Sequence, residues 1–236
     1  MNTESRRQMS ADVVLARRAA VYAALGEPAR LAMIDDLAVS DRSPMELGQR
    51  FGLASNLLAH HLDVLEDVGL IVRFVSAGDR RRRYVRLVRG ALREFPVVCP
   101  QKPVGEMLFL CSHNSARSQL AAALWSARSG LAARSAGTHP AGRVHRGAVA
   151  AARRAGIDFA GAVPRLIGDI SADTQVVTVC DRAHEELSPS NNWWHWSIPD
   201  PVEADTAEAF DAAFADLDAR ITSIIETTPH TKRTKP

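Results

Sequence analysis

Apolar residues in the first part of the chain recur at helical spacing. In residues 12–25 they lie three or four positions apart, which predicts an amphipathic helix. A second such pattern runs from Pro28 to about Val39, and proline at its start fits the first turn of a helix. The pattern therefore predicts two consecutive helices that bury one face each.

The next stretch combines helix caps with a glycine turn. Ser43 is followed three residues later by Glu46, which is a capping box and predicts a short helix through Phe51. Ser55 is expected to cap a longer helix that ends near Val68. Two helices joined by a short turn that contains a glycine are typical of a helix-turn-helix.

Strand-like patterning follows the helices. Residues 70–75 and 80–88 are rich in β-branched and apolar side chains, and Ser-Ala-Gly-Asp separates them. Such an arrangement predicts a β-hairpin.

Apolar strand-like runs alternate with helical stretches from residue 106 onward. Strands are expected at 107–110, 133–138, 175–179 and 193–198, and helices at 118–129, 146–155 and 206–225. This alternation predicts an α/β domain with a parallel sheet and helices on both faces. Ligands of such sheets bind beyond the carboxyl ends of the strands.

A break in the pattern separates these two regions. Residues 90–105 contain three prolines and two glycines, so we expect a linker with one short helix at its start. The chain is thus expected to consist of a flexible N-terminus at 1–11, a mainly α domain at 12–89, that linker, an α/β domain at 106–228 and a flexible tail at 229–236.

Composition agrees with two soluble domains. The chain has 236 residues and is 46% hydrophobic, but no apolar run has the length of a membrane span and no signal peptide is evident. Three widely spaced cysteines do not form a disulfide framework and fit a reducing cytoplasm. We therefore expect a cytoplasmic protein without a membrane partner.

Charge is distributed unevenly between the two regions. Residues 1–100 carry 15 arginines against 12 acidic residues, a net +3, whereas residues 101–236 carry 14 basic and 15 acidic residues, a net −1. Four consecutive arginines lie in the predicted hairpin at Arg80–Arg83. This asymmetry favours a polyanion as the partner of the first region.

The most specific motif follows the first strand of the α/β region. Cys111 lies six residues before Arg117, and Ser118 comes next, at the start of a predicted helix. Backbone N–H groups of such a loop and a guanidinium converge on one point, which suits a tetrahedral oxyanion. The same positive field is expected to lower the pKa of Cys111 and make it a thiolate nucleophile. The candidate oxyanion-binding residues are Ser112, His113, Asn114, Ser115, Ala116 and Arg117.

The string Cys111-Ser-His-Asn-Ser-Ala-Arg117-Ser118 resembles the low-molecular-weight protein tyrosine phosphatases and, more specifically, the arsenate reductases related to them. The resemblance implies that Asn114 braces the loop and that Ser118 stabilises the thiolate. It also implies that Asp200, in the late Asp-Pro pair, is the general acid. Val202 stands where tyrosine phosphatases have a tyrosine, which favours an inorganic oxyanion such as arsenate as the substrate.

Reductases of this kind also need a source of electrons. In the thioredoxin-linked members a pair of later cysteines relays a disulfide, and Cys180 matches the first of the pair, but Leu187 stands at the second position. We therefore expect an external thiol, mycothiol or a similar one, as co-substrate, with a glutaredoxin- or mycoredoxin-like reductant and no bound cofactor. A second hypothesis keeps Cys180 as a thiol that attacks Cys111.

Residues 12–89 resemble the winged-helix repressors of the ArsR/SmtB family. The resemblance rests on Ala24-Leu-Gly-Glu-Pro-Ala-Arg-Leu31, on His60-His-Leu-Asp-Val-Leu-Glu-Asp-Val-Gly-Leu-Ile71 and on the arginines of the hairpin. It implies a homodimer on operator DNA, with the hairpin as the wing. The expected DNA-binding residues are Ser55, Asn56, His60, Arg80, Arg81, Arg82 and Arg83.

Three further expectations concern neighbours of these residues. At least one of Leu57 and Leu58 is expected in the core, and His61 is expected to pack rather than to share a metal ion with His60, because adjacent helical residues point apart. The Cys-Val-Cys element of many arsenic-sensing members is missing from residues 40–47, and Cys99 is interpreted as an ordinary thiol. No metal site is expected.

Taken together, the sequence predicts an ArsR-like regulator fused to a thiol-dependent arsenate reductase with Cys111, Arg117, Ser118 and Asp200 as its catalytic residues. Two alternatives stay open. The second region either only senses an oxyanion without turnover, or it is a phosphatase.

Overall fold

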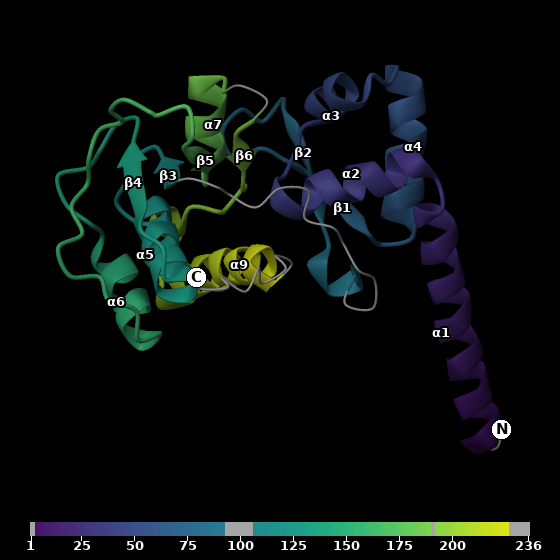
Figure 1. Ribbon diagram of the computed structural model, residues 1–236. Helices are drawn as coiled ribbons and strands as arrows, with labels where there is room; N and C mark the ends of the chain where they lie inside the picture. Colours follow the sequence, from purple (N-terminus) through teal and green to yellow (C-terminus); the bar gives the residue numbers. More distant parts are fainter. Residues whose placement is uncertain (1–2, 93–105, 190–191, 227–236) are drawn as a thin grey trace, which may run out of the picture.

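The protein is described by a computed structural model over residues 3–92, 106–189 and 192–226, shown in Figure 1. Cys99, most of the expected linker and the expected tail lie outside the described residues. The described chain forms a helical part with a hairpin, residues 3–92, and a part built on a sheet, residues 106–226; below they are called the N-terminal and C-terminal halves.

The N-terminal half has its elements in the expected order. They are α1 (Thr3–Leu25), α2 (Pro28–Val39), α3 (Pro44–Phe51), α4 (Ser55–Asp67), β1 (Ile71–Val75), β2 (Arg83–Leu87) and the 3-10 turn η1 (Arg89–Leu92). The predicted capping box is confirmed, because the Ser43 hydroxyl accepts from the Glu46 backbone and the Glu46 carboxylate accepts from the Ser43 backbone. The predicted hairpin is confirmed too, with Ile71 opposite Leu87 and Val75 opposite Arg83.

Two expectations for this half were wrong. Helix α1 begins at Thr3 rather than at residue 12, since no proline or glycine interrupts the helix-forming sequence that leads into it. Ser55 does not cap α4: the N-cap is Ala54, and no side chain there accepts a hydrogen bond from the helix.

Apolar faces of α2, α3, α4 and the hairpin meet in one core. Its fully buried members include Met33, Leu37, Leu47, Leu65 and Val85. Helices α2, α3 and α4 have only 12, 8 and 13 residues, so the packing of these faces, more than helix propensity, stabilises the arrangement.

The C-terminal half is built on parallel strands. Its elements are β3 (Met107–Cys111), α5 (Arg117–Ser129), β4 (Ala133–Gly137), α6 (Arg146–Arg154), β5 (Gln175–Thr178), α7 (Asp181–Leu187), β6 (Trp194–His195), α8 (Pro201–Ala204) and α9 (Ala207–Glu226). In the described part of the chain the strands form one sheet of order β4-β3-β5-β6, and each neighbouring pair is parallel. The α/β prediction is therefore confirmed, although helix α7 was not predicted.

The two faces of this sheet are covered differently from the prediction. Helices α5, α6 and α9 share the large core on one face with Phe109 and Trp196. On the other face Leu108 and Leu110 pack against Ile167 and other loop residues, with only the end of α7 as a helical contribution. The segment from 156 to 174 contains no helix, and its loop residues cover this face, whereas helices were expected on both faces of the sheet.

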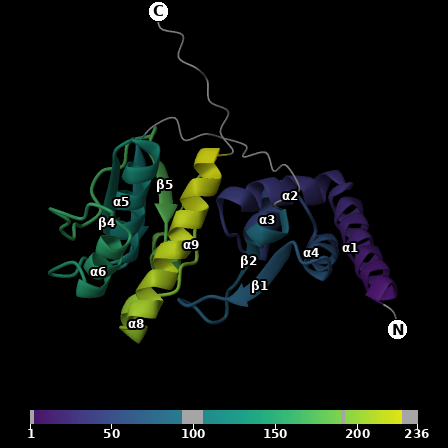
Figure 2. The ribbon, with the colours of Figure 1, turned by 90° about the horizontal axis from the view of Figure 1, so that it is seen from below.

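The two halves are in direct contact, as Figures 1 and 2 show, and α9 runs along the boundary. Asp41, just after α2, accepts two hydrogen bonds from Arg220 of α9, each 3.1 Å long, and both side chains are fully buried. The Trp196 indole N–H donates to the Val39 carbonyl at 2.8 Å. Buried polar contacts thus join the halves across this boundary.

Asp41 is held as a carboxylate by its surroundings. Burial acts to raise its pKa, but the charges of Arg220 and Arg86 outweigh burial and hold the pKa of Asp41 far below its usual range. Within the described residues no helix is both long enough and apolar enough to cross a membrane.

Candidate active site

The loop of residues 112–116 lies between β3 and α5, at the carboxyl end of a central strand. Cys111 is the last residue of β3 and Arg117 is the first residue of α5, so the strand and the helix fix both ends of the loop. Cys111 is only 2% exposed. The expected strand, loop and helix around the Cys-(five residues)-Arg motif are confirmed.

Two groups contact the sulfur of Cys111. The Ser118 hydroxyl oxygen is 3.0 Å from Cys111 Sγ, and the Asn114 backbone N–H donates to it at 3.2 Å. Asn114 also donates from its side chain to Ser118 Oγ at 2.8 Å, which leaves the serine O–H free to point toward the sulfur. These groups can stabilise a negative charge on Cys111.

Asn114 holds the loop in its bent shape. Its φ of +47° is in the left-handed region, which non-glycine residues adopt at a cost that surrounding contacts must offset. Those contacts are present: the Asn114 side-chain oxygen accepts from Gln119 Nε2 at 3.1 Å and from the Arg165 backbone N–H at 2.8 Å. The bracing asparagine expected from the sequence therefore has the required contacts.

Gly137, at the end of β4, allows the loop to pack against the neighbouring strand. A Cβ at this position would lie 2.6 Å from the Ser112 carbonyl oxygen and 3.0 Å from Asn114. A side chain at residue 137 would therefore displace the loop.

The expectation of a lowered pKa at Cys111 was wrong. Burial raises the pKa of the thiol, and the opposing effects of the Arg117 charge and the Ser118 hydrogen bond do not outweigh it. The sequence shows which groups surround the sulfur but not that the sulfur is almost completely removed from water.

Arg117 and Asp200 form an ion pair at the edge of the loop. Arg117 Nη2 is 2.5 Å from Asp200 Oδ2, and Arg117 Nη1 donates to the Ile198 carbonyl at 3.0 Å. Asp200 also caps α8 by accepting from the Val202 N–H at 3.1 Å. The structure thus brings together the Cys-(five residues)-Arg loop and the Asp-Pro pair, which lie 83 positions apart in sequence when measured from Arg117 to Asp200.

A basic cavity opens beside the loop. It has a volume of about 1110 Å³, and its lining residues include His113 and Ser115 of the loop, Arg143, His145, Arg146 and Val202. Val202, which the sequence singled out, thus lies in the wall of the cavity that leads to the loop.

Cys180 also lies beside the loop. It is the N-cap residue of α7, is buried, and its sulfur is 3.4 Å from the Ser112 hydroxyl. Leu187 is the last residue of α7 and packs against the sheet, away from the loop.

The expected DNA-binding residues are exposed. Ser55, Asn56 and His60 lie on the outer face of α4, and Arg80 to Arg83 are exposed at the end of the hairpin. Leu58 and His61 are buried while Leu57 is 45% exposed, so the expectations for these three residues are confirmed.

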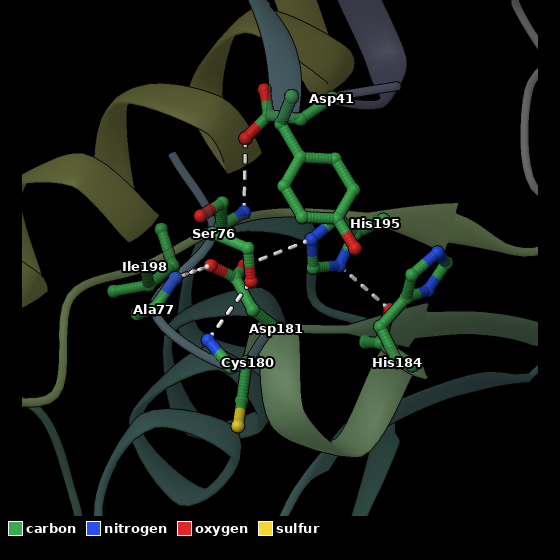
Figure 3. Close-up of polar contacts among 12 residues, drawn as sticks. Asp41, Ser76, Ala77, Cys180, Asp181, His184, His195 and Ile198 are labelled. Carbon is green, nitrogen blue, oxygen red and sulfur yellow. Dashed lines mark hydrogen bonds and ion pairs between the residues drawn. The ribbon is translucent and has the colours of Figure 1, made fainter. Parts of the chain in front are cut away.

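Sequence reasoning missed a polar cluster behind Cys180, shown in Figure 3. Asp181 accepts from His195 Nε2 at 3.0 Å and from the Ala77 backbone N–H at 2.7 Å, so it contacts both halves. Thr178 Oγ1 lies 2.9 Å from His184 Nδ1 and 3.0 Å from His195 Nδ1. No sequence motif marked these residues, because their partners come from distant segments.

No group of three or more His, Cys, Asp or Glu side chains in residues 3–92, 106–189 and 192–226 is arranged to hold a metal ion.

A parallel α/β sheet with a cysteine-arginine loop after a central strand and an aspartate from a late loop defines a class of enzymes that attack oxyanions through sulfur. Residues 106–233 match the family model described as low molecular weight phosphotyrosine protein phosphatase. Because the match covers more than half of the chain, the chain belongs to this family, and its C-terminal half is an enzyme domain of that kind.

Solved structures of two kinds are similar to the same half. The thioredoxin-dependent arsenate reductase of Corynebacterium glutamicum is 26% identical, with 53% of this chain and 62% of that chain covered at a TM-score of 0.42. An arsenate reductase from Archaeoglobus fulgidus is 29% identical, with coverage of 51% and 98% and a TM-score of 0.43. A low molecular weight protein tyrosine phosphatase from T. tengcongensis is 19% identical, with coverage of 52% and 99% and a TM-score of 0.48. A comparison with curated proteins gave no match.

Proposed function

We propose that the C-terminal half reduces arsenate with Cys111 as the nucleophile, and that the N-terminal half is an ArsR-like winged-helix module that binds operator DNA as a homodimer. The observation that carries the enzymatic part is the contact of Cys111 Sγ with Ser118 Oγ at 3.0 Å and with the Asn114 N–H at 3.2 Å. Both groups favour sulfur as an anion, and pure binding of an oxyanion needs no nucleophile.

Arg117 changes partners in the proposed reaction. Arsenate in the loop competes with Asp200 for the guanidinium, and its charge and geometry match the planar donor pair of arginine. Once the Arg117 ion pair is broken, the Asp200 carboxyl lies beside the arsenate and is available as the proposed proton donor. The same exchange therefore binds the substrate and prepares the acid.

The first chemical step then balances as a displacement. Cys111 sulfur forms a bond to arsenic as one As–O bond breaks, and the proton from Asp200 leaves with that oxygen as water. An external thiol of the mycothiol type next takes the arsenic from Cys111. A thiolate of a glutaredoxin- or mycoredoxin-like protein then attacks the sulfur bound to arsenic. A mixed disulfide forms, the S–As bond breaks, and its electron pair stays on arsenic, which leaves as arsenite.

The environment of the later cysteine positions supports an external thiol. Leu187 packs against the sheet, so this site provides no second sulfur for a relay from Cys180. The cavity lined by His113, Arg143 and Val202 opens directly onto the loop and has room for a small thiol beside the arsenic. Val202 offers no aromatic ring on which a phosphotyrosine side chain would stack.

The proposal for the N-terminal half rests on the exposed face of α4 and on the basic hairpin. Ser55, Asn56 and His60 are exposed polar residues on a helix that follows a tight turn after α3, and Arg80–Arg83 end the hairpin. Backbone phosphates of DNA are bound by such arginines, and base edges are read by polar residues of a helix in the major groove.

Arsenite release by the full-length protein tests the enzymatic proposal. Wild type, Cys111→Ser and Cys180→Ser are supplied with arsenate, mycothiol and mycoredoxin. We expect turnover by wild type and Cys180→Ser and none by Cys111→Ser. Loss of turnover in Cys180→Ser, with activity of wild type on thioredoxin alone, would instead establish the second hypothesis, in which Cys180 attacks Cys111.

Two other outcomes decide between the remaining functions. Hydrolysis of an aryl phosphate without any arsenite release would make the domain a phosphatase. Arsenate binding by wild type without turnover of either substrate would make it an oxyanion sensor.

A further inference from the structure

Helix α7 of the C-terminal half holds the turn of the β1–β2 hairpin. The Ala77 N–H donates to Asp181 Oδ2 and the Asp79 N–H donates to Glu185 Oε2, each at 2.7 Å. The Ser76 hydroxyl donates to Glu185 Oε1 at 2.6 Å. Two carboxylates of one helix thus accept hydrogen bonds from three donors of one turn. We call these three hydrogen bonds the latch. Figure 3 shows Ser76 and Ala77 beside Asp181.

The latch depends on a glycine in the turn. A Cβ at Gly78 would lie 2.4 Å from Glu185 Oε2 and 3.1 Å from the Arg182 backbone nitrogen. The backbone of Gly78 does not adopt the left-handed conformation that excludes side chains, so the hairpin itself accepts alanine there. An alanine at residue 78 would therefore displace the Glu185 carboxylate from the turn and crowd the Arg182 backbone, without a requirement for a new hairpin conformation.

The donors in the latch are the kinds that bind nucleic-acid phosphates. Backbone N–H groups and serine hydroxyls commonly contact DNA phosphates alongside arginines. Arg80–Arg83 follow the latched residues directly and are exposed. Asp181 and Glu185 therefore occupy, with their own negative charge, the donors that lead into the basic end of the hairpin.

The N-terminal end of α7, which carries Asp181, also lies at the anion loop. Cys180 is the N-cap residue of α7 and its sulfur is 3.4 Å from Ser112 Oγ, while Asp181 is fixed by His195 at 3.0 Å. In Figure 3 the Cys180 sulfur points away from the Asp181 carboxylate. One short helix thus contacts the anion loop on one side and the hairpin turn on the other.

From these contacts we propose that the latch is an autoinhibitory contact, in which the carboxylates of α7 bind the donors of the hairpin turn and compete with DNA phosphates for them. The inference rests on the proposed DNA-binding role of the N-terminal half. DNA binds better when the turn is released from Asp181 and Glu185, and the two states differ by the latch contacts.

The test compares full-length wild type with Gly78→Ala and with Gly90→Ala, a control because a Cβ at Gly90 would meet nothing within 4 Å. The probe is a fluorescein-labelled duplex DNA of mixed sequence, titrated at low and at physiological salt. We expect Gly78→Ala to bind at least about fivefold more tightly than wild type, and Gly90→Ala to match wild type. Amide hydrogen exchange at Ala77 and Asp79 should be faster in Gly78→Ala alone.

A second variant guards against misfolding. Glu185→Gln removes one latch charge without added volume, and it should shift DNA affinity and amide exchange in the same direction. Unchanged amide exchange in both variants would show that no latch exists in solution. Faster exchange with DNA affinity equal to that of wild type would show a latch that does not inhibit. If neither wild type nor variants bind the duplex at low salt, the proposed DNA-binding function itself fails, and the inference with it.

Discussion

Arg117 has two partners that a tetrahedral oxyanion in the loop would replace. It donates to Asp200 at 2.5 Å and to the Ile198 carbonyl at 3.0 Å, and it is buried. An anion can bind Arg117 only if the ion pair with Asp200 breaks. The free energy needed to break this pair weakens the binding of the anion. Two predictions at the scale of single residues follow from these contacts and from the burial of Cys111.

Replacement of Asp200 by asparagine should change binding and catalysis in opposite directions. Asp200→Asn removes the competitor for Arg117, so inorganic phosphate should bind more tightly. It also removes the proposed acid, so kcat for arsenate should fall by about 100- to 10,000-fold. Titration calorimetry with phosphate and arsenite release measure the two quantities.

Asp211→Asn is the matched control, because Asp211 is half exposed and pairs with Arg154 at 2.5 Å, and neither residue lines the cavity beside the loop. It should leave both phosphate affinity and kcat near the wild-type values. Weaker phosphate binding in Asp200→Asn would contradict the exchange of partners at Arg117.

The raised pKa of Cys111 should be visible in its alkylation. Because burial raises that pKa, the thiolate fraction is small at neutral pH and grows as the pH rises. The alkylation rate of the Cys111 peptide by iodoacetamide, followed by mass spectrometry, should still increase above pH ~8.5, the ordinary pKa of a cysteine. Ser118→Ala removes a contact that favours the thiolate and should move the curve to still higher pH. A rate that is constant above neutral pH would contradict the burial argument.

At the scale of elements, α3 and α4 differ at their N-termini: α3 has a side-chain cap and α4 has none. Measurements of stability can detect this difference. Ser43→Ala removes a capping box in which both hydrogen bonds are present, and it should lower the free energy of unfolding by about 1 kcal/mol. Ser55→Ala is the control, since no side-chain cap bond exists at α4. Urea unfolding of both variants measures the difference, and equal losses would contradict the assigned caps.

The sequence was sufficient for the elements around the anion loop. Cys111 and Arg117 follow an apolar run and precede a helical pattern, so strand, loop and helix were all predicted from local information. Asp200 was also singled out from the sequence, by its place in a late Asp-Pro pair, and it lies against Arg117; its role as the acid stays a prediction.

Helix α7 was missed for a physical reason. Its seven residues, Asp181–Leu187, are mostly charged or polar, and only Ala183 and Leu187 are apolar, so no amphipathic period is visible. What stabilises this helix is tertiary contact, namely the Asp181 bonds to His195 and Ala77. A helix of one or two turns that is stabilised by residues distant in sequence has no recognisable pattern of its own.

At the scale of the whole molecule, Asp41 and Arg220 join the two halves without any exposure to water. Asp41→Asn would remove the fully buried charge that faces both Arg220 and Arg86 and would leave Asp216 as the remaining partner of Arg220. The free energy of unfolding should fall by about 3–5 kcal/mol. The loss should appear in one transition shared by both halves, as followed by tryptophan fluorescence and circular dichroism in urea.

Asp218→Asn is the control for this experiment. Asp218 pairs with Arg128 at 2.8 Å, but the arginine side chain is 48% exposed, and such surface pairs contribute less than about 1 kcal/mol. If Asp41→Asn unfolds in two separate steps, or loses no more than Asp218→Asn, the boundary does not couple the halves.

Contacts across this boundary were beyond prediction from the sequence. Asp41 and Arg220 are 179 positions apart, and each is an ordinary charged residue in its own segment. The sequence marks Gly78 only as a residue of the hairpin turn. The structure adds that a side chain at this position would collide with Glu185 of α7. Burial, not local pattern, gives these residues their roles.

The buried Asp41–Arg220 pair has a consequence for dissection of this chain. A fragment cut within residues 93–105 would carry Arg220 into one piece and Asp41 into the other, each as a newly hydrated charge on an apolar surface with Val39 or Trp196 beside it. In each piece the ion would keep one partner, Arg86 for Asp41 and Asp216 for Arg220, but would lose the partner across the boundary. Mixing the pieces in solution should therefore reunite them. For this protein the natural unit of expression and assay is thus the fused chain.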